Sequence, residues 1–315
     1  MNSIPSLDLS KFLSQDLDEK KQFVNDLGTA FEEIGFISLK NHFLSESLMD
    51  SLYAEVKLFF DLPVDTKIKY EKPELHGQRG YTSFGKEQAV GHKKADLKEF
   101  WHFGQEPHKD LDFTKDYHEN IQVSELQNFN SVGTEAFKML EKTGIYLLKA
   151  IALHLGLAED YFDKWGELGN SILRPIHYPP ITEEPEDAIR AGAHGDINLI
   201  TLLMGASTGG LQVLNKQDQW IDAAPHENEL VINVGDMLER LTNNKLRSTI
   251  HRVINPPKES WSEPRYSIPF FMHPRLDMPL NCLDVCINET SPKKHGDILA
   301  GEFLYERLKA IGLVE

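Results

Sequence analysis

The pattern of hydrophobic and polar positions changes near the middle of the chain. In the first half, apolar residues recur at spacings of three and four, which is typical of amphipathic helices. Stripes of this kind run through 23–34, 48–59 and 123–155. Ser45 is suited to cap the second helix, because its hydroxyl oxygen can accept a hydrogen bond from the first turn. A short strand is predicted at 36–39, so the first half is expected to be mostly helical.

The second half consists of short apolar runs separated by glycine and proline. The runs lie at 171–178, 198–204, 211–214, 229–234, 248–254 and 265–272. Short strands at such spacings are typical of a sandwich, barrel or jelly roll, and a closing helix is predicted at 301–310. Because no linker separates the halves, we expect one domain over 1–315, mainly β with α. Its parts are a helical and irregular region at 1–168, a β core at 169–275 and a C-terminal segment with a helix at 276–315.

Composition and charge narrow the expected partners. The 315 residues include 33 Lys and Arg against 49 Asp and Glu, which gives a formal net charge of −16. This charge disfavours binding to nucleic acid phosphates or to an anionic membrane. No apolar run approaches the ~18 residues of a membrane span, and the opening residues lack the features of a signal peptide. We therefore expect a cytoplasmic protein that acts on a small molecule, as a monomer or weak homodimer.

Three His-x-Asp pairs occur in the chain, and they begin at His108, His194 and His295. Only the pair His194 and Asp196 runs directly into a strand-like segment, and residues two apart on a strand point to the same side. His251 lies in a β-branched strand pattern and can supply a third ligand. Two imidazoles and one carboxylate on strands form a triad that suits non-haem Fe(II). A zinc hydrolase is disfavoured because its usual helical His-Glu-x-x-His is absent.

A candidate anion receptor follows the third histidine. Arg265 and Ser267 form the only Arg-x-Ser of the chain and share one side of a predicted strand. A guanidinium donates a two-pronged set of hydrogen bonds to a carboxylate, and a hydroxyl can add another. With Fe(II), one aspartate and a bound dicarboxylate, Arg265 would bring the local charge to zero, as a buried site requires.

These motifs together resemble the Fe(II)/2-oxoglutarate-dependent oxygenases of the isopenicillin N synthase-like family. The resembling segments are 4–9 (IPSLDL), 31–36 (FEEIGF), 173–180 (LRPIHYPP), 194–196 (HGD), 199–203 (LITLL), 209–213 (GGLQV), 233–236 (NVGD), 251–253 (HRV) and 265–271 (RYSIPFF). They span nearly the whole chain in the family's order. The resemblance implies a double-stranded β-helix (jelly-roll) core, iron held by His194, Asp196 and His251, and 2-oxoglutarate held by Arg265 and Ser267. Tyr178 matches a position that often helps to bind this co-substrate.

The family implies a dioxygenase that couples decarboxylation of 2-oxoglutarate to hydroxylation or related oxidation of a small organic substrate. Its cofactors would be Fe(II), 2-oxoglutarate and O₂, with ascorbate as a support in vitro, and its products would include succinate and CO₂. Two alternatives remain open at this stage. One is an oxidase of the same family that takes all four electrons from its substrate and uses no 2-oxoglutarate. The other is a jelly-roll protein that binds a small anion without catalysis.

The substrate pocket is the least constrained part of the prediction. The stretch 75–110 lacks a clean period and is expected to cover the mouth of the site. We expect Arg79 and Tyr81 to contact a polar or anionic end of the substrate, with Trp101, Phe103 and Phe271 as an apolar wall. The alternative is that these aromatic residues only hold the stretch to the core.

Overall fold

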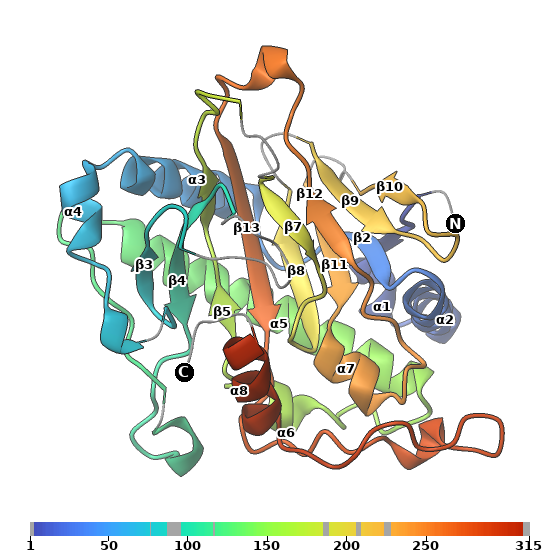
Figure 1. The fold of residues 1–315 in the computed structure, drawn as a ribbon. Coiled ribbons are helices and arrows are strands. Elements are labelled where there is room, and N and C mark those ends of the chain that lie inside the picture. Colours follow the sequence, from blue (N-terminus) through green and yellow to red (C-terminus); the bar gives the residue numbers. More distant parts are fainter. Residues whose placement is uncertain are drawn as a thin grey trace.

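Two β-sheets and a layer of helices make up the fold (Figure 1). The computed structural model describes residues 3–75, 77–86, 96–115, 117–184, 189–205, 209–223 and 228–310. The larger sheet has the order β1 (Ser6–Asp8), β2 (Phe36–Lys40), β11 (Leu230–Val234), β8 (Ile200–Met204), β13 (Arg265–Met272), β5 (Ile172–Leu173), β4 (Glu99–Gly104) and β3 (Gly80–Thr82), and β6 (Ile176–Tyr178) pairs with β13 and β4. The smaller sheet has the order β10 (Trp220–Asp222), β9 (Leu211–Leu214), β12 (His251–Val253) and β7 (Ala191–His194).

Several helices, with α5 at their centre, cover the larger sheet on the side away from the smaller one. Figure 1 shows α5 behind this sheet, whereas β7 and β12 lie in front of it. The helices are α1 (Leu9–Phe12), α2 (Leu17–Glu33), α3 (Glu46–Phe60), α4 (Val64–Ile68), α5 (Phe129–His154), α6 (Asp163–Gly166), α7 (Asp236–Leu241) and α8 (Ala300–Ala310), with short 3₁₀ turns at Pro73–Leu75, Asp112–Thr114, Lys258–Ser260 and Asp284–Cys286. None of the helices among these residues is long and apolar enough to cross a membrane.

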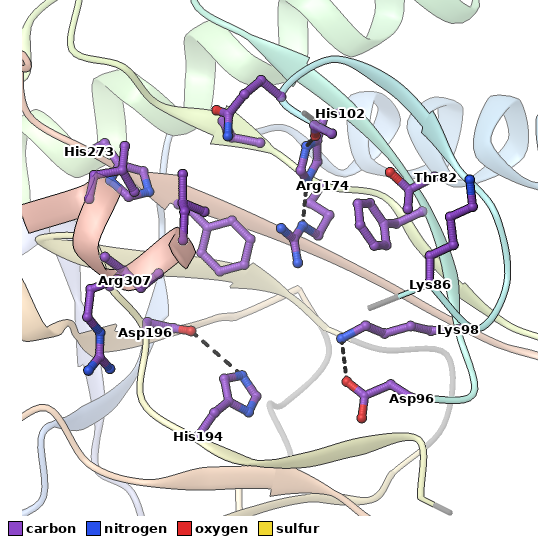
Figure 2. A pocket seen from close by; sticks show the side chains of 18 of the residues that line it. Thr82, Lys86, Asp96, Lys98, His102, Arg174, His194, Asp196, His273 and Arg307 are labelled. Carbon is purple, nitrogen blue, oxygen red and sulfur yellow. Dashed lines mark hydrogen bonds and ion pairs between the residues drawn. The ribbon is translucent and has the colours of Figure 1, made fainter. Parts of the chain in front are cut away.

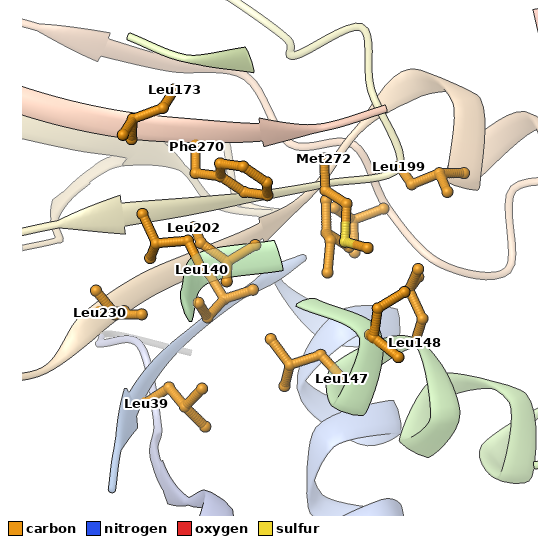
Figure 3. Close-up of a cluster of buried hydrophobic side chains, with 14 of the residues drawn as sticks. Leu39, Leu140, Leu147, Leu148, Leu173, Leu199, Leu202, Leu230, Phe270 and Met272 are labelled. Carbon is orange, nitrogen blue, oxygen red and sulfur yellow. The ribbon is translucent and has the colours of Figure 1, made fainter. Parts of the chain in front are cut away.

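The main hydrophobic core lies between the larger sheet and α5. Figure 3 shows Phe270 and Met272 of β13 near the leucines of α5, and the Phe270 ring meets Phe137 of α5 edge-on at a centroid distance of 5.0 Å. Alternate residues of β13 point into this core, so the residues between them face the smaller sheet. This alternation leaves one side of β13 available for a site between the sheets.

Most predicted elements are confirmed, with shifts at their ends. Ser45 caps α3 by accepting a hydrogen bond from Leu48 N at 3.3 Å. The helix predicted over 123–155 begins only at Phe129. The run 171–178 is divided into β5 and β6 at Pro175, which has no N–H to donate to a ladder. The strands β1 and β2 join the larger sheet, so the N-terminal region contributes to the β core as well as to the helical layer.

Candidate active site

Three side chains with metal-binding atoms meet where β7 and β12 pair. His194 ends β7 and lies opposite His251 in the antiparallel register, while Asp196 lies in the loop 195–199 that leads to β8. Asp196 Oδ1 lies 3.9 Å from His194 Nε2 and 3.7 Å from His251 Nε2. The three ligand atoms are all within 4.8 Å of one another. One ion can therefore contact all three, which leaves the remaining positions of an octahedral ion for other ligands.

Hydrogen bonds fix which nitrogen each histidine presents to this point. His194 Nδ1 donates to the Gly192 carbonyl at 2.7 Å, and His251 Nδ1 donates to the Thr249 carbonyl at 3.2 Å. Both Nε2 atoms are thus left with a lone pair directed at the shared point. Burial, followed by the neighbouring His251, lowers the pKa of His194 to about 4. The His194 ring is therefore neutral at neutral pH, which is the form that binds metals.

The second oxygen of Asp196 is held by two polar side chains of the larger sheet. Thr201 of β8 donates to Oδ2 at 2.5 Å, and Asn233 of β11 donates to it at 2.8 Å. Burial alone would raise the pKa of Asp196, but the neighbouring histidines and these hydrogen bonds bring it below its usual value. The carboxylate is therefore ionised, with Oδ1 directed towards the histidines.

A tight turn brings the Asp196 loop against the start of α7. The backbone N–H of Asp236 donates to the Asp196 carbonyl at 2.7 Å. A Cβ atom added at Gly235 would lie 2.2 Å from the Asn198 carbonyl oxygen. Only glycine permits this close approach, so the NVGD segment at 233–236 both holds the carboxylate and supports its loop.

A small cavity of about 80 Å³ extends from the triad between the two sheets. His194, Asp196 and His251 all line it, together with Arg265, Ser267 and Tyr178. β13 pairs with β6 so that Arg265 lies opposite Tyr178, and the guanidinium lies 5.0 Å from the centre of the Tyr178 ring. Arg265 is 1% exposed. The cavity thus joins the candidate metal-binding triad to a buried cation and a hydroxyl.

A larger cavity of about 590 Å³ opens on the other side of His194 and Asp196. Figure 2 shows Lys98 and Arg174 directed into the same space as these two residues. Arg174 Nε donates to His102 Nε2 at 2.5 Å, and its guanidinium lies 4.4 Å from the Phe100 ring centre and 5.1 Å from that of Phe271. The cavity wall is therefore a rigid combination of aromatic rings and hydrogen-bonded cations.

Three of the five proposed substrate residues are not among those that line the two cavities. Arg79 is 2% exposed and donates to the backbone carbonyls of Gln78, Gln105 and His118, so it stabilises its own loop. Trp101 and Phe103 pack against Phe129 of α5, on the face of β4 that points away from the cavity. The alternative, in which these aromatic residues hold the stretch to the core, fits their positions.

The other two proposed substrate residues lie on the larger cavity. Phe271 lines both cavities. Tyr81 lines the larger one, but its hydroxyl donates to Glu99, which also pairs with Lys67 and His177 inside the protein. Of the stretch 75–110, residues 76 and 87–95 lie outside the described residues.

The sequence analysis did not identify several residues that belong to the site. Thr201 and Asn233 belong to quoted motifs, yet only the fold brings them to Asp196. Phe100 and His102 lie on the opposite face of β4 from the aromatic residues that were expected. Three residues of α8, namely Leu304, Arg307 and Leu308, also line the larger cavity, and Arg307 forms an ion pair with Asp236 at 2.7 Å.

Comparison with known proteins agrees with this geometry. Residues 169–274 match the model of the 2OG-Fe(II) oxygenase superfamily, and residues 4–125 match that of the non-haem dioxygenase in morphine synthesis N-terminal region. A 2-oxoglutarate-Fe(II) type oxidoreductase of Aspergillus fumigatus is 31% identical and is covered over 93% of its length, with 99% of this chain aligned.

Solved structures give the same result. A 2OG-Fe(II) oxygenase family protein from Caulobacter crescentus is 42% identical, with a TM-score of 0.89 over 99% of this chain and 100% of that one. A full-length Neurospora crassa protein, solved in complex with alpha-KG and thymine, is 33% identical, with a TM-score of 0.87 over 98% of this chain and 96% of that one.

The expected jelly-roll fold and the resemblance to isopenicillin N synthase-like oxygenases are thereby confirmed. The comparisons support the use of 2-oxoglutarate, and they give no support to the four-electron oxidase or to the non-catalytic alternative. The chain belongs to the 2OG-Fe(II) oxygenase superfamily and is a non-haem dioxygenase that uses Fe(II) and 2-oxoglutarate.

Proposed function

We propose that His194, Asp196 and His251 bind the catalytic Fe(II), and that Arg265, Ser267 and Tyr178 hold 2-oxoglutarate. The observation that carries this assignment is that His194 and Asp196 line both cavities, while His251 lines the small one beside them. The small cavity leads from the triad to a buried arginine, as a dicarboxylate requires at its distal end. The large cavity leaves room for a separate organic substrate beside the same point.

Each part of the chain has a distinct task in this reaction. The bound iron, with 2-oxoglutarate and O₂, supplies the oxidising chemistry that yields succinate, CO₂ and the oxidised substrate. Thr201 and Asn233 keep Asp196 in the orientation that faces the metal. Arg265 neutralises the distal carboxylate, and the aromatic wall of the larger cavity excludes water from the reacting C–H bond.

We assign the substrate contacts to the larger cavity, with Phe271 and Tyr81 kept from the sequence prediction and Phe100, His102 and Arg174 added. The aromatic rings and the planar guanidinium favour a flat or partly conjugated molecule with hydrogen-bond acceptors. The similar Neurospora crassa protein, which has been solved with thymine, supports the inclusion of pyrimidines among the candidates.

The test of this function is a substrate screen with the purified protein, Fe(II), ascorbate and 2-oxoglutarate. The panel contains thymine, amino acids, small acids and phenolics, and the readout is succinate formed with and without each compound. We expect at least one compound to raise succinate formation and to yield an oxidised product in equal amount. Product formation that continues in the absence of 2-oxoglutarate would overturn the assignment.

We also propose that the protein acts in the cytoplasm, as a monomer or weak homodimer, without a nucleic acid or membrane partner. The net charge of −16 supports the absence of nucleic acid and membrane partners, because it opposes association with phosphates and anionic lipids. Light scattering over a range of protein concentrations measures the oligomeric state, and a stable higher oligomer would contradict it.

A further inference from the structure

A second arginine is buried beside the proposed co-substrate site, and no carboxylate of the described residues pairs with it. Arg190 is 2% exposed and precedes β7. Its Nη2 donates to the Glu263 carbonyl at 3.2 Å, while its Nε is buried without a hydrogen-bond partner among the described residues. A buried charge without an opposite charge is costly to a folded protein. Such a residue therefore points to an anion that arrives with a ligand.

The surroundings of Arg190 identify where that anion would sit. Its guanidinium lies 5.9 Å from the centre of the Tyr178 ring, and that of Arg265 lies 5.0 Å from the same ring. Two buried cations thus lie close to one aromatic side chain of the small cavity. Burial, followed by repulsion from Arg265, lowers the pKa of Arg190 to about 10, so the group remains charged at neutral pH.

We propose that Arg190 is a second cationic positioning residue for the distal carboxylate of 2-oxoglutarate. It does not line the cavity itself, so it acts through its field and through its support of Tyr178, whereas Arg265 makes the direct contact. The proposal rests on the assignment of Arg265 and Tyr178 to the co-substrate. It implies that the two arginines together give the protein a stronger preference for a co-substrate with a negative charge at the far end than Arg265 alone would give.

The experiment compares two co-substrates that differ only in the group at the distal end. Binding of 2-oxoglutarate and of 2-oxopentanoate, which has the same chain length but lacks the distal carboxylate, is measured without oxygen by calorimetry on the Fe(II)-loaded protein. Arg190→Gln should weaken 2-oxoglutarate binding about 10-fold, the size expected for a charge that acts on the carboxylate across a distance rather than by direct contact. The same variant should change 2-oxopentanoate affinity by less than about 2-fold, and Arg190→Lys should keep most of the wild-type preference.

Matched controls separate this role from a general effect of charge or folding. Arg252 lies on β12, donates to Gln212 and stacks on Trp220 at 4.0 Å, outside both cavities. Arg252→Gln removes the same charge and should leave both affinities unchanged. Arg190→Met fills similar space without charge and replaces the glutamine variant if that variant fails to fold. Iron content and melting temperature are measured for every variant.

Each outcome decides the matter. An equal loss of affinity for both co-substrates would make Arg190 a structural residue, and no loss for either would remove it from the site; both results overturn the proposal. Arg265→Leu in the same assay checks the assignment on which it rests. If Arg265→Leu leaves 2-oxoglutarate binding intact, the proposed co-substrate site is wrong. If Arg265→Leu weakens 2-oxoglutarate binding but Arg190→Gln does not, the co-substrate site stands and only the role of Arg190 is wrong.

Discussion

Strands β13 and β4 belong to the same sheet, and each has one face on the cavities and one on the core beneath. In β13 the cavity side contains a charged and a hydroxyl residue, Arg265 and Ser267, and the core side is entirely apolar or aromatic. In β4 the cavity side contains Phe100 and His102, and the core side contains Trp101 and Phe103. Alternation holds in both strands, but only in β13 does residue chemistry tell the two faces apart.

The difference teaches where a strand pattern has predictive power. An arginine is rarely buried without an anion, so Arg265 marks the functional face of β13. In β4 both faces are buried, since every residue from Glu99 to Gly104 is shielded from solvent. Large aromatic residues serve equally well as core and as pocket wall. The sequence therefore predicts that two of the four residues share a face, but not which pair meets the substrate.

The largest expected effect comes from removing a metal ligand on the cavity side. His194→Ala takes away one of three protein ligands, so iron content should fall sharply and turnover should drop more than about 100-fold, beyond the loss typical of an outer-sphere change. Iron analysis and succinate formation measure both. His295→Ala, in another His-x-Asp pair, is the control and should behave as wild type. Loss of iron from the control instead would mean that the wrong pair has been chosen.

The next effect separates the two faces of β13. Arg265→Leu should raise the 2-oxoglutarate requirement by about 100- to 5000-fold, since removing one partner of a buried charge pair costs roughly 3–5 kcal/mol, while iron binding changes little. Phe270→Leu, on the opposite face, should lower the melting temperature without changing the 2-oxoglutarate requirement. If both variants lose stability and neither changes that requirement, the comparison of faces is wrong for this strand.

A matched pair on β4 makes the same separation with a single residue type. Phe103→Ala should lower the free energy of unfolding by about 3–5 kcal/mol, because the ring packs against Phe129 and its removal leaves a cavity in the main core. Its ratio of oxidised product to succinate should remain as in wild type. Phe100→Ala should lower that ratio and alter substrate preference at a smaller cost in stability. Thermal unfolding and product analysis decide, and the reverse pattern would restore Phe103 to the pocket.

The smallest expected effect concerns α8, which lines the larger cavity but belongs to neither of the two strands compared above. Arg307→Gln removes a half-exposed ion pair to Asp236 that is worth about 0.2–1 kcal/mol. Substrate KM should rise a few-fold, because Leu304 and Leu308 of this helix line the cavity, while iron and 2-oxoglutarate affinities stay constant. Lys309→Gln, an exposed change on the same helix, is the control. An equal shift in KM from both variants would exclude a role for this ion pair.

Sequence reasoning reaches the parts of the site where chemistry is local. His194 and Asp196 are two residues apart, and Arg265 and Ser267 share a strand face, so their residue types and spacings already indicate a metal and an anion. The support of Asp196 comes from Thr201 on β8 and Asn233 on β11, which only strand pairing brings together. Arg79 shows the opposite limit: an arginine in an irregular stretch suggests a ligand contact, yet three backbone carbonyls accept its hydrogen bonds.

The most direct test of the account is the location of the iron. Crystals grown without oxygen, with Fe(II) and 2-oxoglutarate, allow iron to be located by its anomalous X-ray scattering. We expect one strong peak within coordination distance of His194 Nε2, Asp196 Oδ1 and His251 Nε2, with the distal carboxylate of 2-oxoglutarate at Arg265. A principal iron peak at any other set of residues, or 2-oxoglutarate bound away from Arg265, would contradict the account.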